Sequence, residues 1–242
     1  MKKIPVILAL VAIALVAYSM SNWGGKKSVK ASKKSTTETR EVRNFDRIDV
    51  SGAFSVDVTY GPEEKVEVEA PENLQKHISV KVKSHTLVIK QDENVSFQSP
   101  GKLEVHITTS KLNEFYLSGA SSVSLKNTLE DNSLKLESSG AANFDGTILV
   151  SEADIELSGA AHAKIEGSTQ EARIELSGAS SLTDYDFETV EADVDLSGAS
   201  SAKITCKKTL VGDVSGTSNL YYKGNVTNPK ISESGVAKVV RR

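Results

Sequence analysis

The sequence predicts an all-β protein, a parallel β-helix (a solenoid) with coils of about 19 to 20 residues and a β-rich N-terminal part. A Ser-Gly-Ala-like motif recurs through the second half, and successive glycines lie 21, 19, 19, 20, 18 and 19 residues apart. Apolar and polar residues alternate on both sides of each glycine, which is the period of a half-buried strand. No helical period of 3.6 residues runs through this half. The glycines are Gly119, Gly140, Gly159, Gly178, Gly198, Gly216 and Gly235.

Each motif is interpreted as a sharp corner between two strands. Glycine accepts the positive φ of such a bend, and the small residue after it lets coils approach to a strand spacing of about 4.8 Å. Serines such as Ser158, Ser177 and Ser197 could stack as a ladder of hydroxyls or bond their own turn. A nucleophile needs one activating base, which seven copies cannot share, and no G-x-S-x-G elbow occurs. The repeat is therefore interpreted as scaffold.

The columns of the repeat predict which side chains face the core. Residues four before and four after the glycine are mostly apolar. Residues three after it are polar, so His162 is interpreted as one polar rung among several. The column before the glycine is Phe115, Leu136, Ile155, Ile174, Val194, Gly212 and Ile231. The column after it is Val123, Phe144, Ala163, Leu182, Ala202, Leu220 and Val239.

The front half, from Glu41 to Leu117, also alternates like strands. It has a turn at Gly61-Pro62, and a loop is predicted over residues 92–101. The Ser-Gly-Ala at 51–53 indicates that the same corner is used once here, before a longer excursion.

The N-terminal segments predict export. Residues 1–21 are predicted to be a signal peptide, because two lysines precede an apolar run that is shorter than the span of about 20 residues a bilayer requires. An uncleaved anchor is the alternative. Residues 22–40, rich in Gly, Ser, Thr and Lys, are predicted to be a flexible basic linker that could touch an anionic membrane surface. Residues 41–242 form the predicted domain. The expected location is the periplasm, the outer surface or the medium.

Charge and cysteine content exclude several classes. From Glu41 onward, 21 Lys and Arg stand against 31 Asp and Glu, so the domain carries a net charge of about −10. A nucleic-acid partner is excluded on this ground, since phosphate binding needs the opposite sign. Cys206 is the only cysteine, so no internal disulfide forms, and its place in the repeat predicts a small buried side chain.

Three motifs in order carry a resemblance to a known family. They are FDRIDVSGAFSVDVTYGPEEKVEVEAPENL, LEVHITTSKLNEFYLSGASSV and repeated LSGAS units. From about Glu41 to Val240 the chain resembles the head GIN domain family of autotransporter-adhesin-like proteins, which is common in Bacteroidota. The resemblance implies a β-helical exported protein and supplies no catalytic residues. Lipid anchoring, which is frequent in the family, has no N-terminal cysteine to carry it here.

One position of the repeat, three residues before the glycine, is acidic in five coils. Stacked acids repel one another, so either bound cations or nearby lysines such as Lys135 and Lys164 must relieve the column. The Gly-Gly-x-Gly-x-Asp repeat of calcium solenoids is absent, and cation binding stays open. We call Glu137, Glu156, Glu175, Asp195 and Asp213 the acidic column.

A polysaccharide-active enzyme is the first alternative function, and its best local carboxylates and aromatics are few. The carboxylates are Asp184, Asp186, Asp193 and Asp195, and the aromatics are Tyr185, Tyr221 and Tyr222. Between Arg47 and Arg241, Arg173 is the only arginine, which leaves little charge to neutralise a uronate. No zinc-ligand spacing links His77, His85, His106 and His162.

The sequence therefore predicts a non-catalytic envelope or surface module with adhesin-like binding of a glycan or protein. No catalytic, cofactor-binding or metal-binding residue is assigned. A purely structural envelope protein is the second alternative. A groove that holds paired carboxylates and a basic residue would favour the enzyme.

Overall fold

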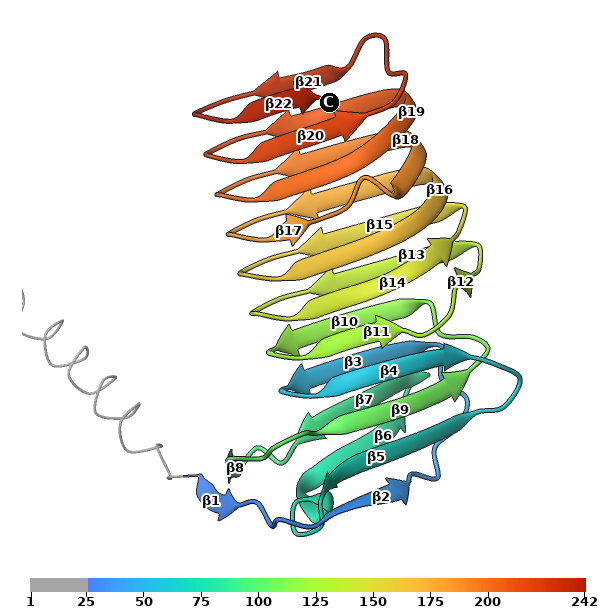
Figure 1. Cartoon of the computed structure of the whole chain (residues 1–242), viewed down its shortest axis with the longest axis vertical. Helices are drawn as coiled ribbons and strands as arrows, with labels where there is room; N and C mark the ends of the chain where they lie inside the picture. The colour runs from blue at the N-terminus through green and yellow to red at the C-terminus, as the bar shows by residue number, and fades with distance from the viewer. Residues whose placement is uncertain (1–25) are drawn as a thin grey trace, which may run out of the picture.

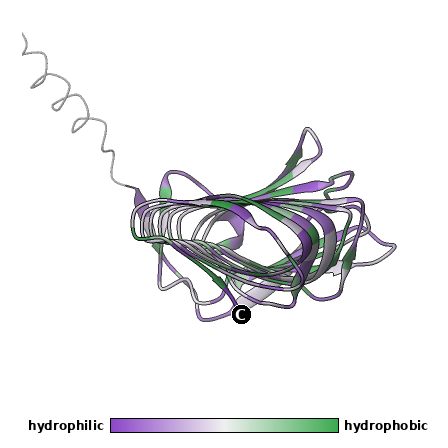
Figure 2. Cartoon of the chain, turned by 90° about the horizontal axis from the view of Figure 1, so that it is seen from above, coloured by the Kyte–Doolittle hydropathy of each residue, from purple (hydrophilic) through white to green (hydrophobic). Residues whose placement is uncertain are grey.

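A computed structural model describes residues 26–242, so the predicted signal peptide lies outside the described residues. The chain winds as a parallel β-solenoid of about seven turns, as the repeat predicts (Figure 1). Viewed along the solenoid axis, the coils superpose as a flattened ring (Figure 2). Within residues 26–242, no helix is long and apolar enough to span a bilayer.

Each coil contributes one strand before its glycine corner and one after it, so the solenoid has a pre-corner sheet and a post-corner sheet. The pre-corner sheet contains, in pairing order, β7 (Thr86–Gln91), β3 (Arg47–Gly52), β10 (Glu114–Gly119), β13 (Ser133–Ser138), β15 (Glu152–Leu157), the second halves of β16 (His162–Leu176), β18 (Phe187–Leu196) and β19 (Ser201–Val214), and β21 (Lys230–Glu233). The post-corner sheet contains β9 (Glu104–Thr109), β4 (Ser55–Tyr60), β11 (Ser122–Leu125), β14 (Asn143–Leu149), the first half of β16, β17 (Ser181–Leu182), the first half of β19, β20 (Asn219–Lys223) and β22 (Lys238–Arg241). A two-residue strand, β12 (Leu129–Glu130), pairs with β14.

The corners are left-handed turns that exclude any side chain. Gly178 has a φ of +71°, and a Cβ built on it would lie 2.6 Å from the carbonyl oxygen of Gly159 in the coil below. The Ala179 N–H donates to that same oxygen at 2.7 Å, so the coils touch backbone to backbone. The corner assignment is confirmed, and glycine is required both by backbone conformation and by space.

The serines that bond in the corner differ from those the sequence suggested. Ser180 and Ser200, two residues after their glycines, are buried, and each hydroxyl donates to a leucine carbonyl oxygen of the coil below, at 3.1 and 3.3 Å. The Ser200 hydroxyl oxygen in turn accepts a hydrogen bond from the Ser218 hydroxyl of the next coil, at 3.2 Å. Ser177, which precedes its glycine, is exposed. A hydroxyl ladder therefore exists, three residues later than expected, because that position points into the corner.

The predicted apolar columns are confirmed as the core. Residues of both columns stand in register between neighbouring coils, for example Ile155 beside Ile174 and Phe144 beside Ala163. One continuous cluster of buried apolar residues runs from Phe45 to Val226. Cys206 is completely buried, as expected, and burial raises the pKa of its thiol. Burial of these columns is the main stabilising contribution, since each large side chain gives about 1.5–3 kcal/mol.

The front half folds back beneath its own first coil. The coil formed by β3 and β4 has the β10–β11 coil on one side and the β7–β9 coil on the other (Figure 1). The chain therefore makes a corner at Gly52 and then forms the excursion predicted from sequence, which contains β5 to β9 and lies below the β3–β4 coil. It returns to the other side of that coil with β10. The spatial order of the first coils is not their order in the chain.

Antiparallel strands close this lower end of the solenoid. β5 (Lys65–Pro71) pairs with β9, and β6 (Ile78–Lys83) pairs with β7. A single 3₁₀ turn (η1, Gln75–His77) joins them. We call β5, η1 and β6, with β2 described below, the cap.

Two segments expected to be unstructured are strands. In the predicted linker 22–40, β2 (Ser35–Thr39) pairs with β5, and β1 (Lys27–Lys30) pairs with β8 (Val95–Gln98) in the predicted loop 92–101. The prediction from composition assumed that a segment must bury apolar surface to become ordered. These strands bury little apolar surface and are ordered all the same. They are held by backbone ladders and by Asn73, whose side chain bonds the backbone of Lys30 and Ser32 at 2.8 Å.

Candidate functional site

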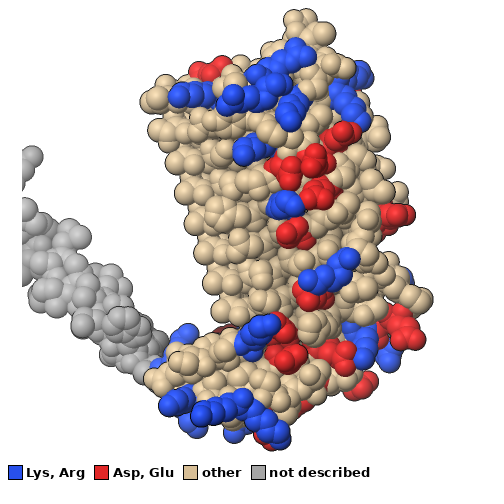
Figure 3. Space-filling model, in the orientation of Figure 1, with Lys and Arg blue, Asp and Glu red and all other residues tan. Residues whose placement is uncertain are grey.

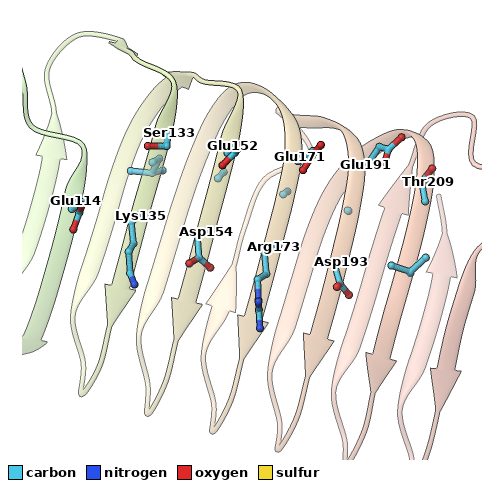
Figure 4. A pocket seen from close by; sticks show the side chains of 15 residues that line it. Glu114, Ser133, Lys135, Glu152, Asp154, Glu171, Arg173, Glu191, Asp193 and Thr209 are labelled. Atoms are coloured by element: carbon cyan, nitrogen blue, oxygen red, sulfur yellow. The ribbon is translucent and has the colours of Figure 1, made fainter.

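The outer surface of the pre-corner sheet carries three parallel columns of charged side chains. The acidic column is one of them, and its members stand beside one another in successive coils, as predicted. A second column lies two residues earlier on each strand, and a third lies two residues earlier again. Each column crosses the strands, so the three together form a charged lattice over several coils. Figure 4 shows the second and third columns.

The second column alternates in sign from coil to coil. Successive members pair in register, and the Arg47 guanidinium contacts the Glu114 carboxylate at 3.2 Å. We call Arg47, Glu114, Lys135, Asp154, Arg173 and Asp193 the alternating column. Opposite charges on directly neighbouring strands attract, with about 0.2–1 kcal/mol per pair. The sequence analysis missed this column, although the position five before each glycine would have revealed it.

The alternating column also relieves part of the acidic column. The Lys135 ammonium lies 2.8 Å from the Glu137 carboxylate, and Arg173 contacts Glu175 at 2.5 Å. The bond to the neighbouring carboxylate raises the pKa of Lys135 and that of Arg173. Lys164, the other predicted screening residue, lies on the post-corner sheet and contacts Glu166 instead, so this part of the expectation is wrong.

The third column consists of glutamates at the edge of the sheet. Glu152, Glu171 and Glu191 stand in register, and Glu191 contacts the Lys208 ammonium at 2.9 Å. We call these three the outer glutamates. They are followed by Thr209, where the run of acids ends.

A groove of about 620 Å³ lies between the outer glutamates and the alternating column. Figure 4 shows both columns projecting from successive coils on either side of it. The outward-facing charged side chains form its walls, and Ala153, Ala172 and Ala192, whose side chains are buried, line it between them. The groove spans at least five coils, from Glu114 to Thr209. Its shape follows from the repeat, since the outward-facing charged positions stand in register from coil to coil.

Two smaller hollows lie on the same outer surface. One, of about 440 Å³, is lined by Tyr116 and Glu137 among others, and one of about 200 Å³ lies over Glu175 and Asp195. The Tyr116 hydroxyl donates to Glu114 at 2.9 Å, and burial followed by this bond raises the tyrosine pKa. The hollowed, charged surface of the pre-corner sheet is therefore the candidate functional site.

The residues considered for an enzyme are not brought together. Asp193 lines the groove and Asp195 lines a different hollow, while Asp184 and Asp186 lie in the loop between β17 and β18. Tyr222 is buried in the core and is not available for stacking on a sugar, contrary to expectation.

The remaining aromatic candidates and His162 lie on the outside. The Lys223 ammonium lies 4.1 Å from the centre of the Tyr185 ring, and the Arg242 guanidinium lies 5.3 Å from that of Tyr221. His162 is a polar rung as predicted, with a nitrogen 2.6 Å from the Ser181 hydroxyl. Each of these contacts joins residues of the surface, away from the groove.

Comparison with known proteins identifies the family. The family described as "Putative auto-transporter adhesin, head GIN domain" matches residues 44–226. The chain belongs to this family. No curated protein matches the sequence. The match covers β5, η1 and β6 of the cap and nearly all of the solenoid, and it begins after β2 and ends before β21 and β22.

Solved structures of several bacterial proteins share this fold. A putative adhesin from Bacteroides fragilis superposes with a TM-score of 0.83 at 21% identity, covering 88% of this chain and 100% of that one. A putative adhesin from Parabacteroides distasonis gives 0.73 at 21% identity, with 89% and 100% covered. A protein from the same species described as a putative lipid binding protein gives 0.72 at 15% identity, again with 89% and 100% covered. At these identities the comparison establishes the solenoid fold of this head GIN protein.

Proposed function

We propose that this protein is a non-catalytic, exported module that binds a glycan or protein ligand along the outer surface of its pre-corner sheet. The observation that carries the proposal is the groove of about 620 Å³ between two ordered columns of charge. The adhesin names given to the family and to solved structures of the same fold support a binding role. Export is supported by the short apolar run within residues 1–21.

The charge pattern of the groove suits an extended ligand with charges of both signs. Along the alternating column the sign changes at every coil, so charges of the same sign lie two strand spacings apart, roughly 9.6 Å. A ligand must place its own charges at the same spacing. Such matching gives specificity and orientation more than affinity. A peptide segment with alternating charge and a zwitterionic polysaccharide are the ligand chemistries with this property.

A polysaccharide-active enzyme has one feature in its favour. The groove holds paired carboxylates together with Arg173, which is the combination such an enzyme needs. However, Asp154, Glu171 and Asp193 are exposed, whereas a general acid is usually enclosed by apolar groups that raise its pKa. The same charges also recur in several coils, so no single pair is distinguished. We therefore favour binding.

Arrays of glycans and matrix proteins, probed with the purified chain, test the proposal. Ligands retained by the chain are then titrated against two matched variants, Arg173→Glu in the groove and Lys164→Glu on the other sheet. Both residues are basic, exposed and paired with a glutamate two positions later. Arg173→Glu is expected to weaken binding about tenfold or more, whereas Lys164→Glu leaves it nearly unchanged.

Three outcomes would count against the proposal. Failure to retain any ligand favours the purely structural envelope protein. Equal losses in the two variants place binding outside the groove. New reducing ends or unsaturated products, formed when the chain is incubated with an array polysaccharide, would show that the groove catalyses a reaction.

A further inference from the structure

A second cluster of functional side chains lies on the outer surface of the post-corner sheet, at the lower end of the molecule. Here β5 of the cap, β9 and β4 lie side by side, in that order (Figure 1). This surface is separate from the groove, which belongs to the pre-corner sheet. A site on this surface is therefore independent of the proposed function.

Three potential metal ligands converge on these strands. Glu69 of β5 stands directly opposite Glu104 of β9, and His106 follows two residues later on the same side of β9. One ligand atom from each residue lies within 4.8 Å of the other two. All three side chains are half-buried, which limits the conformations they lose on binding. Among the residues that the structure describes, no other three carboxylate, imidazole or thiol groups converge in this way, and the acidic column contains no such group.

The histidine has an orienting partner on its other side. Asp57 of β4 stands directly opposite His106, and its carboxylate lies 3.6 Å from Nδ1. The Asp57 carboxylate is in turn contacted by the Lys126 ammonium at 2.8 Å. A carboxylate beside one imidazole nitrogen favours the tautomer that leaves the lone pair on the other nitrogen, and metal-binding histidines commonly have such a partner.

We propose that Glu69, Glu104 and His106 form a binding site for a divalent transition-metal ion, with Zn²⁺ as the preferred ion. Imidazole and carboxylate are both ligands of Zn²⁺, and three protein ligands leave one position for water or an external group. Ligand atoms on a tetrahedral zinc lie about 3.4 Å apart, so small side-chain rotations close the observed cluster around an ion. Imidazole is a poor ligand for Ca²⁺, which takes oxygen atoms.

One lysine competes with the ion. The Lys102 ammonium lies 3.0 Å from the Glu104 carboxylate, and its side chain is 81% exposed. The hydrogen bond to Glu104 is the main cause that raises the pKa of Lys102, and the charge of Glu69 adds to it. Because Lys102 is so exposed, it leaves the carboxylate easily when a doubly charged ion arrives.

The neighbouring Glu67 stands opposite His106 but is held by another cation. Its carboxylate lies 2.8 Å from the Lys65 ammonium, and it is not part of the converging group. The site therefore has two carboxylates and one imidazole as ligands. Bound metal would tie β5 of the cap to β9 of the solenoid, and so stabilise the closure of the lower end.

Calorimetric titration of the purified chain, with any affinity tag removed, tests the site. Zn²⁺ is expected to bind with a stoichiometry of one and to raise the melting temperature, whereas Ca²⁺ at equal concentration does neither. His106→Gln and Glu104→Gln should each weaken Zn²⁺ binding at least tenfold. The matched control is His162→Gln, which alters an exposed strand histidine on the same sheet outside the cluster.

Two further variants separate this site from nonspecific binding of zinc to an acidic surface. Lys102→Ala should strengthen Zn²⁺ binding several-fold because it removes the competitor, and Asp57→Asn should weaken it about tenfold because it removes the orienting partner. Absence of stoichiometric binding in the parent chain would overturn the proposal. So would equal affinities of His106→Gln and His162→Gln, or Zn²⁺ binding that Lys102→Ala leaves unchanged.

Discussion

The two ends of the solenoid are finished in different ways. At the lower end, antiparallel strands of the cap cover the coil formed by β7 and β9, and Val66 and Leu74 are completely buried. At the upper end, β21 and β22 lie at the edge, where Ile231 and Val239 are only partly buried and Val236 is 69% exposed. The difference teaches that stacking alone buries a coil only when it has a neighbour on each side.

Charge marks the upper end as well. Residues 203–242 contain eight Lys and Arg but only two Asp and Glu, and Figure 3 shows basic side chains gathered there above the acidic middle. Unpaired strand edges invite further strands, and clustered lysines oppose such pairing. The lower end is closed by strands, and the upper end is shielded by charge.

The largest expected effect tests whether a middle coil and an end coil tolerate the same change. Gly178→Val forces a β-branched residue into a left-handed turn against the Gly159 carbonyl, at a cost of about 2–6 kcal/mol. Gly235→Val introduces the same strain in the last coil, which can fray without exposing the core. Urea melts followed by far-ultraviolet circular dichroism should show a large loss of stability for Gly178→Val and a small one for Gly235→Val. Equal losses would contradict the contrast between the middle and the upper end.

An intermediate effect is expected from truncating one apolar side chain at each end. Leu74→Ala removes a fully buried side chain under the cap and should cost about 2–5 kcal/mol. Ile231→Ala removes a side chain that is already partly exposed, so its cost should be well below that range. Melting temperatures of the two variants, compared with that of the parent, measure the difference. A more damaging Ile231→Ala would mean that the upper end is buried by a contact outside the single chain.

The smallest effect separates two ways of fastening β2. The Gln75 side chain is buried and donates to the carbonyl oxygens of Thr36 and Val68, at 2.7 and 3.0 Å. Gln75→Ala leaves both without this donor and should cost about 1–3 kcal/mol, with faster amide exchange in β2. Lys34→Ala removes only an exposed ion pair with Glu72 and should leave both readouts unchanged. Faster exchange in β2 of Lys34→Ala would show that the ion pair, rather than the buried amide, holds the strand.

Sequence reasoning reached the repeated half because each coil repeats one pattern of alternation around a glycine. The columns through Ile155 and Phe144 are read directly from the spacing, since parallel stacking in register follows from a constant coil length. The cap was not predicted, because its antiparallel pairings occur only once. β2 was mistaken for a linker for the same reason, and because its pairing partners lie 28 to 36 residues further along the chain, from Glu67 beside Thr39 to Pro71 beside Ser35.

The candidate sites divide along the same line. The acidic and alternating columns lie at fixed offsets from the glycines, so the sequence contains them, and only the second was overlooked. Glu69 and His106 come together through a single antiparallel pairing of β5 with β9. The register of this pairing cannot be predicted from the repeat, because it occurs only once. A site that depends on the unrepeated part of the chain could therefore not be predicted from the sequence, and it is found only in the structure.

Because the alternating column changes sign at every coil, its charge order survives only when coils are added or removed in pairs. If the coil that carries Asp154 were deleted, Lys135 would stand beside Arg173, and like charges would meet where opposite charges now pair. If the next coil were deleted with it, Lys135 would stand beside Asp193 and the alternation would be restored. Each mismatch is small, about 0.2–1 kcal/mol, but it always has the same sign. A folding chain that skips one coil therefore meets repulsion, and length changes by coil pairs preserve the charge order.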